Sequence, residues 1–97
     1  MQRQKAENQD IKLSGSEGKL EGRYANYIRV GYNAFEFLFD FGQHYFENEQ
    51  AMIFTRVIIT PNYAKDLLDI LQCAIEGYEG NHGKIEVENK LIIPNQI

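Results

Sequence analysis

The residues that could support catalysis or metal binding are few and lie far apart in the chain. His44 is followed by Glu47 and Glu49, whereas His82 comes much later. An acid–base or metal site could be drawn from His44, His82 and Asp40, but the ligand spacings typical of such sites, HExxH or CxxC, do not occur. The motifs GxSxG, GxxxxGK[ST] and GxGxxG are also missing. We therefore expect no catalytic residue, no cofactor and no metal site, and we interpret the two His as solvated loop residues.

The only cysteine, Cys73, excludes an intrachain disulfide and is compatible with a reducing cytoplasm. It falls within a helical pattern with no His nearby in sequence, so we interpret it as a buried, inert thiol. The sequence shows neither the apolar segment of a signal peptide nor a run of eighteen apolar residues. We expect a cytoplasmic protein that does not enter a membrane.

Charged residues are distributed unevenly along the 97-residue chain. The chain has a formal net charge of −4, and residues 24–83 carry three Lys or Arg against eight Asp or Glu. An acidic surface repels phosphate backbones, so nucleic-acid binding by this part is unlikely on electrostatic grounds.

The chain divides into three parts by composition. Residues 1–23 hold only isolated apolar side chains, which predicts a flexible N-terminal arm. Residues 24–83 contain the periodic apolar pattern of a folded domain, in the order strand, strand, strand, helix. Residues 84–97 alternate Ile and Val with charged residues before LIIPNQI, which indicates a fourth strand or an extended arm.

Residues 24–43 predict a β-hairpin. Apolar side chains alternate over residues 24–32, and four Phe recur at every second position from Phe35 to Phe41, so that they share one face of a strand. A two-residue loop at residues 33–34 places the larger apolar sets of both strands on the same face, and any even loop length preserves this. The predicted partners are Tyr32 with Phe35, Val30 with Phe37, Ile28 with Phe39 and Asn26 with Phe41.

After a loop over residues 42–50, residues 51–60 predict a third strand that is apolar on both faces. A helix then begins at Thr60-Pro61, where Thr is expected to accept an N-cap hydrogen bond and Pro occupies the first helical position. Its glycines place the end near residues 78–80. The apolar stripe of this helix, which we expect to cover the Phe side chains, consists of Ala64, Leu67, Leu68, Leu71, Ala74, Ile75 and Tyr78.

These elements predict an α+β fold with an antiparallel sheet of three or four strands, in which three strands are followed by one amphipathic helix. A folded chain this short is only marginally stable as a monomer. Its abundant aromatic residues favour a homo-oligomer, a dimer or larger, in which the sheet is extended. Arg29, Asp40 and Arg56 fall on the face opposite the Phe side chains and, with Glu36, could form a cross-strand charge ladder. The candidate interaction surface is Tyr27, Arg29, Leu38, Asp40, Phe54 and Arg56.

Residues 23–83 resemble a family of small prokaryotic proteins recorded only as a domain of unknown function. The resemblance rests on three segments in the same order: Tyr24-Ala25-Asn26, the FLFDFGQ segment at residues 37–43, and the strand-to-helix junction at residues 56–65. It implies a compact strand-strand-strand-helix unit with no assigned activity. The N-terminal arm and the LIIPNQI tail lie outside the resemblance.

Three functions from different classes remain open. The first is a structural or protein-interaction module that pairs through its sheet. The second is a binder of extended polypeptide, because the order of strands and helix is similar in outline to the export chaperone SecB. The third is a single-stranded nucleic-acid binder, in which Tyr24, Tyr27 and Tyr32 stack on bases and Arg23 and Arg29 contact phosphates. The acidic body disfavours the third, and an enzyme ranks below all three.

Overall fold

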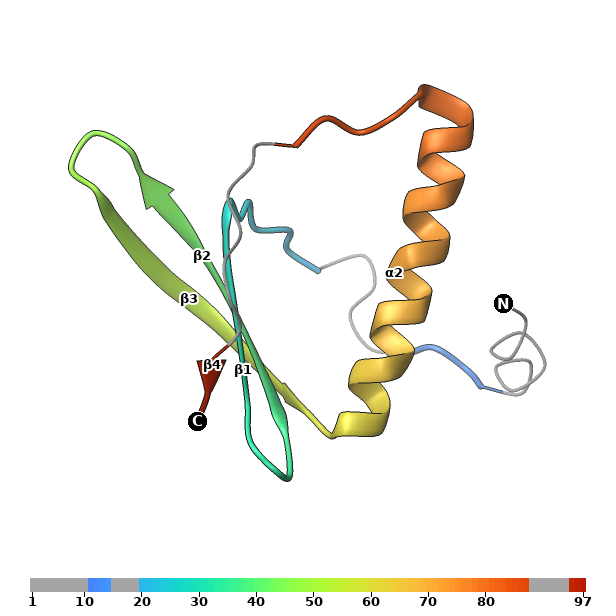
Figure 1. Cartoon of the computed structure of the whole chain (residues 1–97), viewed down its shortest axis with the longest axis horizontal. Coiled ribbons are helices and arrows are strands. Elements are labelled where there is room, and N and C mark those ends of the chain that lie inside the picture. Colours follow the sequence, from blue (N-terminus) through green and yellow to red (C-terminus); the bar gives the residue numbers. More distant parts are fainter. Residues whose placement is uncertain (1–10, 15–19, 88–94) are drawn as a thin grey trace.

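The computed structural model of the chain describes residues 11–14, 20–87 and 95–97. The strands form one sheet in the order β3-β2-β1-β4, with antiparallel pairs β1–β2 and β2–β3 and a parallel pair β1–β4 (Figure 1). The predicted α+β fold, a three-stranded antiparallel sheet followed by one helix, is confirmed. The elements are β1 (Tyr27–Tyr32), β2 (Phe37–Tyr45), β3 (Gln50–Ile59), α2 (Pro61–His82) and β4 (Asn95–Gln96).

The ends of the chain are only partly described. Residues 11–14 and 20–26 contain no helix or strand and are mostly exposed. The possible fourth strand is present as β4, which is two residues long and parallel to β1. The apolar residues 91–93 of the predicted tail lie outside the described residues, as does much of the predicted N-terminal arm.

The hairpin between β1 and β2 has a longer loop than the sequence predicts. Residues 33–36 form the loop, so Val30 pairs with Phe39 and not with Phe37. The side-chain oxygen of Asn33 accepts hydrogen bonds from the backbone N–H groups of Phe35 (2.8 Å) and Glu36 (3.0 Å). This Asn turn stabilises the wider loop, and the predicted register is wrong by two residues.

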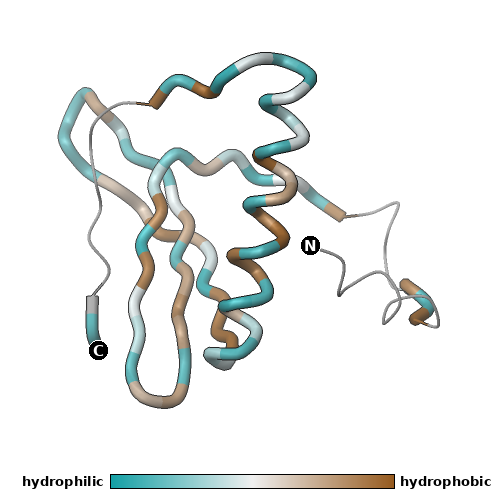
Figure 2. The backbone as a smooth tube through the Cα atoms, turned by 45° about the vertical axis from the view of Figure 1, so that its right-hand side comes forward, coloured by the Kyte–Doolittle hydropathy of each residue, from teal (hydrophilic) through white to brown (hydrophobic). Residues whose placement is uncertain are grey.

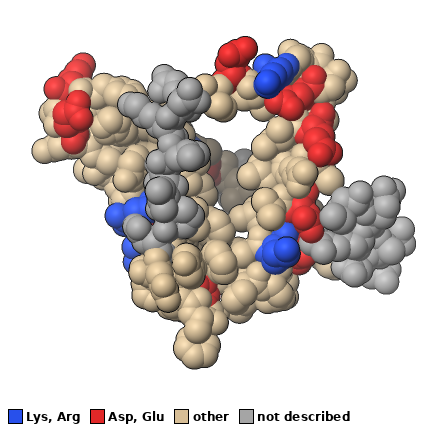
Figure 3. Space-filling model, in the orientation of Figure 1, with Lys and Arg blue, Asp and Glu red and all other residues tan. Residues whose placement is uncertain are grey.

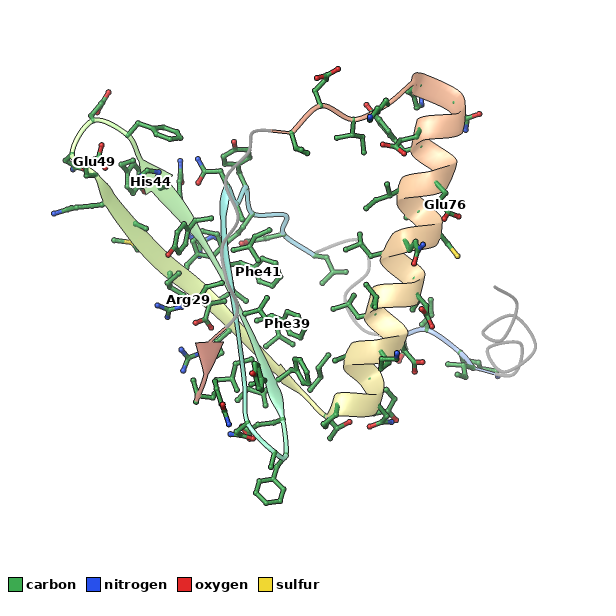
Figure 4. All side chains as sticks on the ribbon, viewed as in Figure 1. Arg29, Phe39, Phe41, His44, Glu49 and Glu76 are labelled. Carbon is green, nitrogen blue, oxygen red and sulfur yellow. The ribbon has the colours of Figure 1, made fainter. Side chains whose placement is uncertain are left out.

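Because the register differs from the prediction by two residues, an even number, the side chains of β1 and β2 remain on their predicted faces of the sheet. Phe37 and Phe39 line a cavity with α2, and the labelled Phe39 and Phe41 lie on the α2 side of the sheet (Figure 4). Phe35, by contrast, belongs to the loop and is 80% exposed. The predicted row of four Phe is therefore a row of three on β2.

The second hairpin is tighter than predicted. β2 continues to Tyr45 and β3 begins at Gln50, so the predicted loop over residues 42–50 is reduced to residues 46–49. Asn26 explains part of this extension, although it precedes β1. Its side chain accepts a hydrogen bond from the His44 N–H (2.7 Å) and donates one to the His44 carbonyl (3.4 Å), as a neighbouring strand would do with its backbone.

A β-bulge interrupts the pairing of β2 with β3. Thr55 pairs with Phe41 and Ile53 with Gly42, which leaves Phe54 as the extra residue. Gly42 is buried at this point, and a Cβ atom added there would collide with the backbone carbonyl of Met52. Only glycine allows the two strands to approach so closely.

We expect Gly42→Ala to destabilise the fold by about 1–3 kcal/mol, because the methyl group must push the backbone of β3 away. Chemical denaturation monitored by circular dichroism measures the change. Gly77→Ala is the matched control: no atom lies within 4 Å of its added Cβ, and alanine favours a helix by up to about 1 kcal/mol. Equal destabilisation by both substitutions would contradict this role for Gly42.

Helix α2 follows β3 after a single residue, Thr60. Thr60 is the N-cap, as predicted, but its hydroxyl donates to the Asn62 side-chain oxygen (2.6 Å) and does not cap the helix. The predicted end at residues 78–80 is too early. The helix continues to His82, and Gly83 ends it with a positive φ of 95° and a hydrogen bond from its N–H to the Glu79 carbonyl (3.0 Å).

The apolar stripe of α2 does not pack closely onto the sheet. Among the described residues, no hydrophobic side chain is buried, and Leu68 in the middle of the stripe is 56% exposed. Figure 2 shows apolar residues recurring along both α2 and the strands, and Figure 3 shows an opening between them. The expectation that the Phe side chains form a core under the helix is therefore wrong for the single chain.

Candidate functional site

Asp40 is the centre of a three-residue charge cluster on the sheet face away from α2. It lies on the middle strand β2, directly between Arg29 of β1 and Arg56 of β3. Oδ2 of Asp40 accepts from Nη2 (2.8 Å) and Nε (3.2 Å) of Arg29, and also from Nη2 of Arg56 (3.0 Å). Oδ1 accepts from Nε of Arg56 (2.7 Å). The predicted cross-strand ladder is confirmed for these three residues, whereas Glu36 lies in the hairpin loop.

Burial differs sharply within the cluster. Asp40 is 3% exposed, while the side chains of Arg29 and Arg56 are 42% and 52% exposed. The hydrogen bonds from Arg56 and then Arg29 hold the pKa of the Asp40 carboxyl well below its usual range and outweigh the opposing effect of burial. The same hydrogen bond from Arg56 raises the pKa of its guanidinium. Asp40 is therefore ionised at any physiological pH.

This shift predicts an acid-dependent loss of stability. The pKa of Asp40 is lower in the folded state than in the unfolded state, where it is about 3.9. Its contribution is therefore present above about pH 4 and is lost as the pH falls below that value. We expect the urea midpoint of unfolding to fall between about pH 4 and pH 2, and Asp40→Asn to reduce this slope. An identical slope in the variant would show that other carboxyl groups cause the loss.

A cavity of about 260 Å³ lies against the cluster. Four residues of the candidate interaction surface line it: Arg29, Leu38, Asp40 and Arg56. Strand alternation in the sequence predicts that these four residues share one face of the sheet. The pairing of β2 with β1 and β3 brings them together. Ile97 also lines the cavity, because residues 95–97 lie beside β1; the sequence indicated a fourth strand over residues 84–97 but not which strand it would pair with.

The other two residues of the candidate surface lie outside this cavity. The ring of Tyr27 is 6.5 Å from that of His44, centre to centre. Phe54 is the unpaired residue of the bulge, and the guanidinium carbon of Arg23 lies 3.8 Å from the centre of its ring. The strict alternation that groups Phe54 with Arg56 does not hold across the bulge, because the extra residue shifts the pairing of β3 with β2 by one position.

The residues considered for acid–base or metal chemistry are not brought together. His44 is on β2 and not in a loop, 4.6 Å from the ring of Phe46, whereas His82 ends α2 and lies 4.8 Å from Tyr78. Within the described ranges, no group of three or more His, Cys, Asp or Glu could hold a metal ion. Cys73 is exposed, contrary to prediction, because nothing described covers its side of α2.

A second, apolar surface lies between the sheet and α2. It is a groove of about 380 Å³, lined by Val30, Phe37 and Phe39 on one side and by residues of α2 such as Leu68 and Leu71 on the other. The sequence predicted these residues but placed them in a closed core. Alternation and helical periodicity indicate which side chains face each other, but not how closely the helix approaches.

The fold and these two surfaces define a small α+β domain with an open apolar groove and a separate arginine-rich cavity. The chain belongs to the family described as "Protein of unknown function (DUF3467)", whose model matches residues 1–87. The resemblance found in the sequence is thereby confirmed, and the match includes the N-terminal arm, which we had placed outside it.

No curated protein and no solved structure matches the chain. No helix in the described ranges is long and apolar enough to cross a membrane.

Proposed function

We propose that the chain is a structural, protein-interaction module that acts as a homo-oligomer, in its simplest form a dimer. The observation that carries this proposal is that no hydrophobic side chain among the described residues is buried. Apolar burial is the main favourable term in folding, and a helix whose apolar stripe remains in water is marginal. The groove therefore requires an occupant for the fold to be stable.

A second copy of the chain fits the groove better than an unrelated partner. Each copy offers both an apolar helix stripe and an apolar sheet face, so a two-fold arrangement buries both on both copies. The patch contains ten apolar side chains, which is about a third to a half of the 20–30 residues that each partner contributes to a standard interface. These exposed or half-buried side chains are Val30, Phe37, Phe39, Phe41, Val57, Leu67, Leu68, Leu71, Ile75 and Tyr78.

Charge supports the same occupant. None of the ten side chains is charged, although Lys65 also lines the groove, and in Figure 3 acidic groups are distributed along α2. Nucleic acid is a poorer occupant, because the body of the chain is acidic and repels a phosphate backbone.

Sedimentation equilibrium of the purified chain at micromolar concentration tests the proposal, and we expect twice the chain mass. A monomer that unfolds cooperatively at this concentration would refute it. The SecB-like alternative predicts a different result: an unfolded client protein binds in the groove and its aggregation slows. We expect the dimer to leave client aggregation unchanged, because the second copy already fills the groove.

A further inference from the structure

The charge cluster on the other face of the sheet has unused hydrogen-bond donors. A guanidinium carries five N–H donors. The carboxylate of Asp40 contacts only Nε and Nη2 of each arginine. Among the contacts of the described residues, neither Nη1 group is engaged. Both arginines therefore keep donors for another acceptor, and both are about half exposed.

The cluster also has an excess of positive charge. Two guanidinium groups share one carboxylate, which leaves a net charge of +1 on a domain that is otherwise acidic. Because Asp40 is buried and its negative charge is already contacted by both arginines, an anion arriving from solvent meets the arginines first.

Asp40 fixes the position of both arginines before any ligand arrives. Its two oxygens hold Arg29 and Arg56 from opposite sides, across three adjacent strands. Two guanidinium groups held in this way lose little further side-chain entropy on binding, and their planar forks match the geometry of carboxylate and phosphate oxygens.

The cavity beside the arginines is large enough for one such group. Its volume is about 260 Å³, and its other walls are formed by Val30, Gly31, Leu38 and Ile97 (Figure 4 shows Arg29 on the face away from α2). Leu38 and Ile97 line the cavity beside the two guanidinium groups, and apolar surroundings strengthen charge-assisted hydrogen bonds.

We propose that the cavity formed by Arg29, Asp40 and Arg56 binds a single oxyanion group, a carboxylate or a phosphate. This site is separate from the groove that forms the proposed dimer, and the inference does not depend on the oligomeric state.

Inorganic phosphate and acetate are the probes, each titrated against sodium chloride at the same ionic strength and followed by NMR of the arginine Nε–H signals. We expect saturable shifts of the Arg29 and Arg56 signals with at least one probe. Phosphate alone would identify a phosphate group as the ligand, and acetate would identify a carboxylate. Shifts that chloride reproduces at equal ionic strength would overturn the proposal.

The decisive variant is Asp40→Asn, which keeps the shape of the side chain and raises the local charge from +1 to +2. Asn keeps one oxygen that can accept from the arginines, and we expect the added unit of positive charge to outweigh the loss of the other. The anion should therefore bind about tenfold more tightly to this variant and raise its melting temperature more than that of the parent chain. A purely structural cluster predicts a less stable protein without tighter binding, and that result would overturn the proposal.

Two further variants complete the test. Arg56→Lys keeps the charge but loses the planar fork, so we expect binding to weaken by about fivefold or more while the fold is retained. Lys84→Ala removes one positive charge at an exposed position away from the cavity, and we expect it to bind the anion as the parent chain does. Equal weakening by both variants would indicate general charge attraction and refute a site.

Discussion

Leu68→Glu is expected to abolish the proposed dimer at micromolar concentration. Leu68 lies in the middle of the apolar stripe of α2 and lines the groove. A carboxylate buried there without a partner costs several kcal/mol, so we expect the dissociation constant to rise by about 100-fold or more. Because no hydrophobic side chain is buried among the described residues of the single chain, we also expect the helical circular dichroism signal to fall when the proposed dimer separates.

The matched control places the same charge on the other side of the helix. Cys73 is exposed and does not line the groove, so Cys73→Glu should sediment and unfold as the parent chain does. Leu68→Met, which conserves volume and polarity, should also remain dimeric. If Leu68→Glu remained a dimer of unchanged affinity, the two copies would have to meet through another surface.

The double substitution Arg29→Gln/Arg56→Gln is expected to have the second large effect. It leaves the Asp40 carboxylate, which is 3% exposed, without a cation. An unpaired buried carboxylate favours its protonated form, so the pKa of Asp40 should rise above its unfolded value of about 3.9. Stability should then be greatest below about pH 4 and fall as the pH rises, which is the reverse of the parent chain.

Urea denaturation of this double variant between about pH 3 and pH 7 measures the reversal. Adding Asp40→Asn to the double variant is the control, because a neutral amide needs no cation. We expect this triple variant to recover stability at pH 7. A double variant as stable as the parent at pH 7 would show that solvent reaches Asp40 and that the arginines contribute little to folding.

The sequence predicted the faces of the sheet well because side-chain alternation depends only on local geometry. Val30 and Phe39 share the α2 side, and Arg29 and Asp40 share the other, as the pattern required. The start of α2 at Pro61 was also predicted, since proline is preferred at the first helical position.

The features that the sequence did not predict depend on specific side-chain contacts. The register follows from the hydrogen bonds of Asn33, and the length of β2 from those of Asn26. The displacement of Phe54 follows from a bulge at Gly42, and an isolated glycine in a strand pattern is the signal that could have indicated it. The distance of α2 from the sheet depends on tertiary packing, which neither strand alternation nor helical periodicity specifies.

Because β1 begins only at Tyr27, different parts of the sheet are expected to open at different rates. β1 pairs with β2 only as far as Gly42, and Asn26 extends this support by contacts to His44. Residues beyond that point form a two-stranded ribbon, which is marginal alone. In hydrogen–deuterium exchange, amides near the 46–49 turn should therefore exchange within the shortest labelling times, whereas those around Asp40 should stay protected the longest.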